Sequence, residues 1–123
     1  MDKIWLKSYR PGAAHDIDPA QYRSVPHMLE ESFKKNAARP FSVCMDRWMT
    51  YGQLDDLSSA MGAWLQSQGL EPGARVAIML PNVPQFAVTM AGILRAGYTC
   101  VNANPPYTAR ELEAQLKDSG ATT

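Results

Sequence analysis

Few residues of this sequence combine the type and the spacing that metal binding or nucleophilic catalysis requires. His15 and His27 lie in different segments, and neither belongs to a cluster with the spacing of metal ligands. We expect both imidazoles to be solvated or hydrogen-bonded locally. Cys44 has no adjacent histidine or basic residue to lower its thiol pKa, and Cys100 falls in an apolar run. Both are predicted to be structural residues, so no metal site is predicted.

The charged and hydroxyl residues of the predicted helices suggest no reaction either. Ser32 and Lys35 match the S-x-x-K pattern of some serine nucleophiles, but the companion motifs are absent. The acidic pairs at 30–31 and 55–56 are interpreted as exposed helix positions. The second pair also falls in a first turn, where the helix dipole favours negative charge. The sequence therefore predicts no catalytic residue.

Phosphate binding is the remaining possibility, because a strand followed by a helix can cradle a phosphate. That cradle needs glycines and free backbone N–H groups. The turn at 80–84 has no glycine and contains two prolines, and neither a dinucleotide fingerprint nor a P-loop motif occurs. The later strand exit at 102–108 is more polar but also rich in proline, which favours a rigid connection over a ligand loop. No cofactor-binding residue is predicted.

Composition narrows the class of protein. The chain has 123 residues, 46% of them hydrophobic, with 12 basic residues balancing 12 acidic ones. This apolar fraction excludes a disordered chain, and the zero formal charge argues against nucleic-acid binding. Two cysteines cannot form a disulfide-rich secreted scaffold. The length suits one domain at most, and because Thr123 comes directly after a helical pattern, we expect the sequence to be cut inside a larger domain.

Targeting and membrane signals favour the cytoplasm. The N-terminus lacks the apolar run and small-residue cleavage site of a signal peptide. Residues 76–94 are uncharged over 19 positions, which is long enough to span a membrane. However, Pro81 and Pro84 interrupt this run, so we interpret it as a short strand and a separate helix.

The first half of the chain is predicted to contain two helices around a hairpin. Residues 1–23 are expected to be irregular, although Trp5, Leu6 and Tyr9 are apolar enough to pack against something. Ser24 is expected to cap a helix that ends by Asn36, followed by a hairpin of residues 41–45 and 48–51. Thr50 with Gln53 predicts a capping box, and Gly69 a helix end. The face expected to be buried carries Leu54, Leu57, Met61, Trp64 and Leu65.

The second half alternates strands and helices. Residues 75–80 and 98–101 read as buried strands, separated by a helix that we expect Asn82 to cap and Gly97 to end. Thr108 with Glu111 predicts another capping box, before a helix that reaches Gly120. The order βαβα predicts an α/β fold of three-layer type, with a parallel sheet flanked by helices and a short N-terminal hairpin.

Several motifs, taken in order, resemble those of adenylate-forming enzymes. The opening Trp5-Leu6-Lys7-Ser8-Tyr9 with Pro11 is similar to bacterial long-chain fatty acid–CoA ligases in particular. The other motifs are GARVAIMLPN at 73–82, GILRAG at 92–97, VNANPPYTAREL at 101–112 and DSGA at 118–121. The resemblance implies that residues 24–123 are the first part of a large N-terminal, AMP-binding domain, preceded by the irregular segment 1–23.

The resemblance also implies a function for a longer parent protein. Such enzymes join a long-chain fatty acid to ATP, with magnesium, and then transfer the acyl group to coenzyme A. The family's phosphate loop, magnesium-binding glutamate and catalytic lysine lie beyond residue 123, so no functional residue is carried over. The segment itself is then an inactive scaffold. Peripheral association with the inner face of the membrane and self-association of the segment are left open.

Two other readings remain. The parent could be a different adenylate-forming ligase, which takes another acid or performs adenylation only. Alternatively, the chain could be a self-standing α/β binding module without an enzymatic parent. Motifs downstream of Thr123 would separate these readings.

Overall fold

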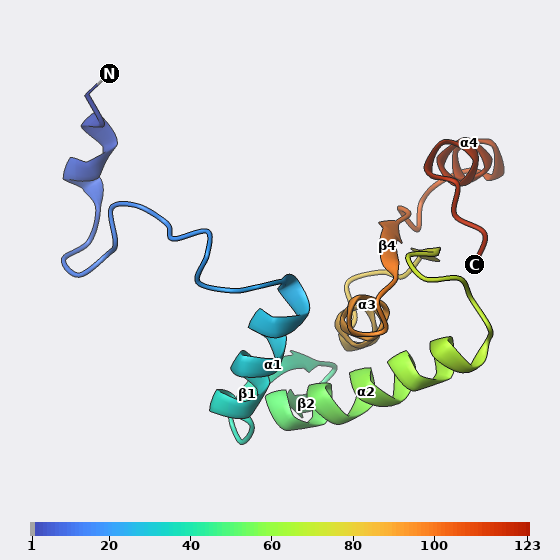
Figure 1. Ribbon diagram of the computed structural model, residues 1–123, viewed down its shortest axis with the longest axis horizontal. Coiled ribbons are helices and arrows are strands. Elements are labelled where there is room, and N and C mark those ends of the chain that lie inside the picture. Colours follow the sequence, from blue (N-terminus) through green and yellow to red (C-terminus); the bar gives the residue numbers. More distant parts are fainter. Residues whose placement is uncertain (1) are drawn as a thin grey trace.

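The computed structural model describes residues 2–123 as a mixed α/β fold (Figure 1). A parallel pair of strands and an antiparallel hairpin form two separate sheets, and helices pack around them. The elements in chain order are η1 (a 3₁₀ helix, Ile4–Ser8), α1 (Val25–Asn36), β1 (Pro40–Cys44), β2 (Arg47–Thr50), α2 (Tyr51–Ser67), β3 (Arg75–Ile78), α3 (Pro84–Arg95), β4 (Thr99–Asn102) and α4 (Ala109–Ser119).

Short-range signals place most of the helix ends. The Ser24 side chain accepts a hydrogen bond from the His27 N–H at 3.2 Å, which confirms the predicted start of α1. Both predicted capping boxes are present, with Thr50 and Gln53 at α2 and Thr108 and Glu111 at α4. These caps satisfy backbone donors that would otherwise lack a partner.

The predicted hairpin is confirmed, with its strands shifted slightly from the expected bounds. β1 and β2 pair antiparallel across Met45 and Asp46, which have φ angles of 48° and 60°. Two central residues with positive φ are typical of the two-residue turns that match the twist of a hairpin.

The predicted parallel sheet is also confirmed, because β3 and β4 pair in parallel with Val76 opposite Cys100. α3 packs on this sheet, and α4 lies beyond the sheet from α3 in Figure 1. The expected cap at Asn82 is wrong: Val83 is the N-cap, without a side-chain hydrogen bond, and α3 begins at Pro84. Proline at the first helical position needs no donor, so the helix starts there without an asparagine cap.

The chain end forms a further contact with the sheet. The backbone N–H of Ala77 in β3 donates to the carbonyl of Thr123 at 2.7 Å. The N–H of Thr99 donates instead to the carbonyl of Ala74, on the β4 side. Thr123 therefore occupies part of the β3 edge that faces away from β4.

The core consists of two clusters on either side of α3. One contains Leu65, Val76, Ile78, Ile93 and Tyr98, from α2, the sheet and α3. The other joins α1, α2 and α3 through Phe33, Leu54 and Ala91. The prediction that the helix of residues 84–95 packs on more than one side is thus confirmed.

The buried face of α2 differs from the predicted one. Leu54 and Leu65 are buried as expected, but Leu57 and Trp64 are 49% and 53% exposed. The face turned to α3 instead includes Ser58 and Gly62, which are small. A β-carbon added at Gly92 of α3 would lie only 2.8 Å from the Met61 side chain. Close approach of the two helix backbones therefore decides which face of α2 is buried.

The N-terminal segment extends away from the body (Figure 1). The expectation that its apolar residues pack is not met for Trp5 and Tyr9, which are 50% and 43% exposed. Its contacts are local, such as the Lys3–Asp16 ion pair and the edge-on packing of Tyr9 against His15. Among residues 2–123, no helix is both long and apolar enough to cross a membrane.

Candidate functional site

Ligands of parallel sheets bind at the carboxyl ends of the strands, so these two exits are the first place to look for a site. After β3, the Val83 N–H donates to the Pro81 carbonyl at 2.8 Å. After β4, the buried Ala103 donates its N–H to the Ile78 carbonyl at 2.8 Å, and Tyr107 donates to Asn104 at 3.0 Å. These three backbone N–H groups form hydrogen bonds within the chain.

The two histidines lie in different parts of the structure, His15 in the N-terminal segment and His27 in α1. His27 accepts a hydrogen bond at Nδ1 from the Arg23 N–H at 3.3 Å, and its Nε2 lies 3.1 Å from Glu31. The prediction of local hydrogen bonding is confirmed for His27. His15 is exposed beside Tyr9 on the N-terminal segment. Within the described part of the chain, no three metal-ligating side chains come together.

The cysteines are half-buried members of different sheets. Cys44 ends β1, and Cys100 lies in β4, where its thiol donates to the Asn102 side chain at 3.4 Å. Burial raises the pKa of the Cys100 thiol above its ordinary value of 9.0, so the thiol is protonated at neutral pH. A protonated thiol is a poor nucleophile, as expected of a structural residue.

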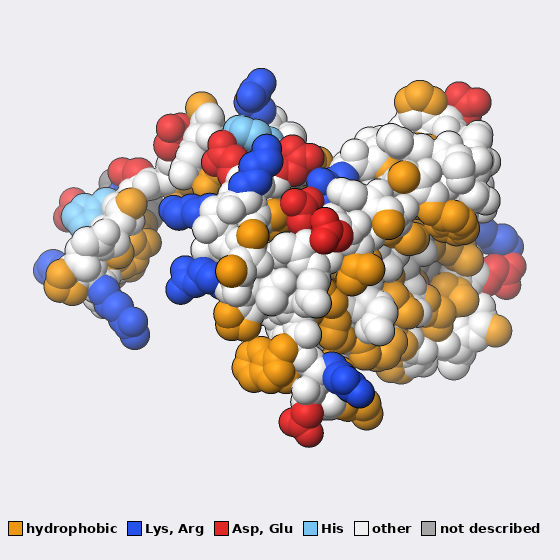
Figure 2. Space-filling view, turned by 90° about the horizontal axis from the view of Figure 1, so that it is seen from below, with side chains coloured by type: hydrophobic (Ala, Val, Ile, Leu, Met, Phe, Trp, Pro, Cys, Tyr) orange, Lys and Arg blue, Asp and Glu red, His pale blue; other side chains and the backbone are white. Residues whose placement is uncertain are grey.

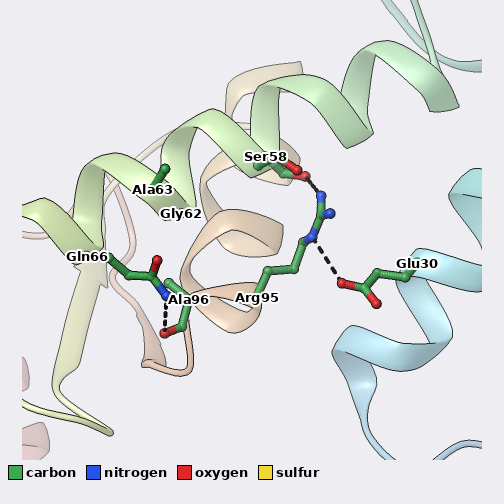
Figure 3. Close-up of a pocket in the computed structure, with 8 residues that line it drawn as sticks. Glu30, Ser58, Gly62, Ala63, Gln66, Arg95 and Ala96 are labelled. Atoms are coloured by element: carbon green, nitrogen blue, oxygen red, sulfur yellow. Dashed lines mark hydrogen bonds and ion pairs between the residues drawn. The ribbon is translucent and has the colours of Figure 1, made fainter.

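The most developed polar cluster surrounds Arg95 at the end of α3 (Figure 3). Its Nη1 donates to the Ser58 hydroxyl at 2.7 Å and to the Asp55 backbone carbonyl at 2.9 Å, and lies 2.8 Å from the Asp55 carboxylate. Its Nε lies 3.6 Å from the Glu30 carboxylate, and the guanidinium stands over the Phe33 ring at 5.6 Å. One side chain thereby connects α1, α2 and α3.

The charge of Arg95 is compensated by acidic side chains. The Arg95 side chain is only 16% exposed, and a guanidinium remains charged in proteins. Burying it is tolerable because two carboxylates and a hydroxyl surround it. The prediction that Glu30 and Asp55 are exposed is therefore wrong, because both are half-buried and pair with Arg95, whereas Glu31 and Asp56 are exposed as predicted.

Sequence reasoning missed Arg95 because its partners are 37 to 65 positions away in the sequence. One signal was available, since Arg95 is the first charged residue after a 19-residue uncharged run. A single cation on a buried helix requires acidic partners, and the acidic pairs at 30–31 and 55–56 offer them.

A small cavity of about 230 Å³ lies beside this cluster. Its lining includes Glu30, Ser58, Gly62, Gln66 and Arg95. Gln66 reaches across it to donate to the Ala96 carbonyl at 3.4 Å (Figure 3). Because the guanidinium is already paired, the cavity offers no free cation and no activated nucleophile. The contacts of Arg95 hold the three helices together.

Comparison with known proteins identifies the family of this chain. Residues 29–123 match the family model described as AMP-binding enzyme. The chain is 46% identical over 123 residues to a long-chain-fatty-acid–CoA ligase of Escherichia coli O6:H1 and 45% identical over 122 residues to one of Yersinia pestis. These matches cover 99% and 98% of this chain and 22% of each relative, so the chain spans about a fifth of their length.

A solved structure is similar in both fold and sequence. NpsA of Klebsiella oxytoca, in complex with 3-hydroxyanthranilyl-AMSN, matches with a TM-score of 0.78 and 28% identity. The match covers 82% of this chain and 21% of NpsA. A structure of the N-terminal subdomain of NpsA alone matches with a TM-score of 0.76. Since the family model covers more than half of the sequence, the chain belongs to the family of AMP-binding enzymes.

Proposed function

We propose that this chain is the leading part of the AMP-binding domain of a long-chain fatty acid–CoA ligase. The observation that carries the proposal is the 46% identity to such a ligase over the whole chain, the N-terminal segment included. In this proposal residues 1–23, which include the short helix η1, are the N-terminal segment, and residues 24–123 begin the domain.

The reaction of the proposed parent enzyme activates a fatty acid carboxylate, which is a poor electrophile. The fatty acid carboxylate attacks the α-phosphorus of ATP, and pyrophosphate leaves to give an acyl-adenylate. The thiol of coenzyme A then attacks the acyl carbon, loses its proton and releases AMP. ATP, coenzyme A and the fatty acid are the substrates in this proposal, and Mg²⁺ accompanies the ATP.

The residues present do not fit a nucleotide or magnesium site. The strand exits are folded by their own backbone hydrogen bonds, and the Arg95 guanidinium is already paired with carboxylates. No metal-ligating cluster of three side chains occurs in residues 2–123. We therefore assign this part of the protein a scaffold role, in which the Arg95 cluster and the β3–β4 sheet support the remainder of the domain, and we expect it to be inactive alone.

The proposed location of the enzyme in the cell follows from the polarity of its substrates. A long-chain acid partitions into the membrane, whereas ATP and coenzyme A are polar. We therefore propose a cytoplasmic enzyme that associates peripherally with the inner face of the membrane, and a segment that self-associates when it is isolated.

Another adenylate-forming ligase is the second candidate. The similarity to NpsA, which was solved with an aryl adenylate analogue, favours it. However, its 28% identity is well below the 45–46% shared with the fatty acid–CoA ligases, so the fatty acid reaction is preferred. The same similarities to enzymes argue against a self-standing binding module.

A chimera tests the proposal directly. The corresponding residues of the Escherichia coli ligase are replaced by this chain, and fatty-acid-dependent pyrophosphate release is measured across a series of acid chain lengths. We expect a folded chimera with activity on long-chain acids. Because the motifs that separate the two candidates lie downstream of residue 123, the acid preference of the full-length parent protein, measured as pyrophosphate release over the same series of acids, tests the second candidate. Fatty-acid-dependent ATP–pyrophosphate exchange by residues 1–123 alone would contradict the scaffold role.

A further inference from the structure

The outer face of the β1–β2 hairpin is apolar although it is exposed to solvent. Val43 and Trp48 lie opposite each other in the strand register, and they are 50% and 66% exposed. Met49, the next residue of β2, packs on the core cluster around Phe33. Since successive side chains of a strand point to opposite faces, Val43 and Trp48 lie on the face turned away from that core. The solvated face of an antiparallel sheet usually carries polar residues instead.

The turn of the hairpin is apolar as well. Met45 has a φ of 48° and is 93% exposed, at a position where asparagine, aspartate or glycine is usual. Leu57 of α2 lines a groove of about 380 Å³ together with Trp48, and it is half exposed, so it continues the apolar surface. The four exposed apolar residues are here called the hairpin patch: Val43, Met45, Trp48 and Leu57.

The part of the chain that carries most of the hairpin patch is basic. Residues 34–48 contain four basic residues and a single acidic one, Asp46. All four basic residues are exposed, and none of them forms an ion pair within the described residues 2–123. They are Lys34, Lys35, Arg39 and Arg47. Figure 2 shows hydrophobic side chains gathered over the lower part of the body and basic side chains along its left edge.

We infer that the hairpin patch is the surface by which the protein contacts an anionic phospholipid bilayer. Tryptophan favours the boundary between water and hydrocarbon, and exposed basic residues are attracted to anionic headgroups. The inference rests on the peripheral membrane association in the proposed function, and it names the residues that make the contact.

A bilayer fits this surface better than a folded protein partner. Met45 and Asp46 form the turn of a hairpin and are both exposed, so the apolar side chains sit on a convex edge of the molecule. A folded partner would need a cavity of matching shape, whereas a fluid bilayer adapts to the edge. The proposed substrate, a long-chain acid, dissolves in the same bilayer, so contact there brings the enzyme to its substrate.

The charges at the turn limit the depth of contact. Asp46 and Arg47 follow Met45 directly and are exposed, and ionised groups are costly to transfer into hydrocarbon. Both charges therefore remain among the headgroups, while Met45 and Trp48 reach the edge of the hydrocarbon layer. Each basic residue near an anionic surface strengthens binding by about fivefold, so the association is reversible and depends on lipid charge.

Flotation of the full-length parent protein with lipid vesicles tests this surface. Vesicles of phosphatidylcholine with phosphatidylglycerol should bind the protein about tenfold more tightly than vesicles of phosphatidylcholine alone, or better. Met45→Asp combined with Trp48→Ser should weaken binding to the anionic vesicles by about tenfold or more. Ile17→Asp is the matched control, because Ile17 is 91% exposed but lies outside the hairpin patch, and it should leave binding unchanged.

A second pair of substitutions tests the charges without altering the hairpin. Lys34→Glu combined with Lys35→Glu, at exposed positions of α1, should also weaken binding to the anionic vesicles by about tenfold or more. Pyrophosphate release from an acid dissolved in detergent should be the same for all variants, which checks that they are folded. If the unmodified parent releases no pyrophosphate with any fatty acid, the proposed ligase function fails, whatever the vesicles show.

Oxidation of Met45 by hydrogen peroxide distinguishes a bilayer from cover by the remainder of the parent protein. The exposed thioether should be oxidised quickly in the full-length protein and protected when anionic vesicles are added. Slow oxidation without vesicles would overturn the inference, because another part of the parent would then cover the hairpin patch. Failure of the unmodified protein to bind anionic vesicles would also overturn it, as would binding that survives both pairs of substitutions.

Discussion

The Arg95 guanidinium lies 2.8 Å from the Asp55 carboxylate and joins the last turn of α3 to the first turns of α2. The same nitrogen atom reaches the fully buried Ser58 hydroxyl, while the Nε atom faces Glu30 of α1. The arrangement makes Arg95 the polar link between the three helices, with the apolar clusters around Phe33 and Leu65 on either side.

Replacement of Arg95 by alanine should destabilise the fold. The change leaves Asp55 and Glu30 without a cation and removes packing on Phe33. Because both carboxylates are partly exposed, we expect a loss of about 1–3 kcal/mol in the free energy of unfolding, less than for a fully buried pair. Urea denaturation measures this loss. Arg110→Ala, at an exposed site on α4, should cost less than about 0.5 kcal/mol, and an equal effect of the two substitutions would refute the linking role.

Gly92→Ala should also be destabilising, although alanine is the better helix former. The new β-carbon would lie 2.8 Å from the Met61 side chain and 3.1 Å from the Ser58 carbonyl, so α2 and α3 must separate. Overpacking of this kind costs about 1–3 kcal/mol. The control is Ala60→Gly at an exposed position of α2, which should cost about 1 kcal/mol by helix propensity alone. If Gly92→Ala stabilises the chain in thermal unfolding, the close helix contact is wrong.

The hydrogen bond between Ala77 and Thr123 should slow exchange of the Ala77 amide proton. Removal of residues 121–123 takes away the acceptor, so exchange at Ala77 should accelerate. The Ala103 amide donates to Ile78 within the sheet and serves as the internal control. Hydrogen–deuterium exchange followed by NMR measures both sites. Unchanged protection at Ala77 in the shortened chain would show that this edge of β3 is covered by other means.

The start of α4 should be sensitive to acid. Hydrogen bonds from the Thr108 backbone N–H and hydroxyl hold the pKa of Glu111 below its ordinary value of 4.5. Since the folded-state pKa is depressed, the stabilising contribution is complete above the unfolded value and is lost as the pH falls through the folded value. NMR titration of Glu111 below pH 5 should show the low pKa and fraying of the first turn of α4. Thr108→Ala should return the pKa toward 4.5, and a titration that is the same in both chains would contradict this account.

Local sequence determined the ends of most elements, because their partners lie within a few residues. Ser24 and the capping boxes at Thr50 and Thr108 satisfy backbone N–H groups three positions further along the chain. Gly120, with a φ of 65°, ends α4. The alternation of strands and helices then predicts the parallel pairing of β3 with β4, since a helical crossover returns the chain in the same direction. The predicted cap at Asn82 was nevertheless wrong, because α3 begins at Pro84 and needs no asparagine cap.

Only the tertiary structure decided which sides of the helices are buried and where the charges pair. Periodicity predicts that Leu57 and Trp64 are buried, but close packing of Gly62 and Gly92 turns α2 so that they are exposed. Arg95 takes its partners from helices that lie tens of residues earlier in the sequence. A local sequence pattern predicts the contacts that a segment makes within itself. Which other segment packs against that segment depends on long-range contacts, and no short stretch of sequence contains that information.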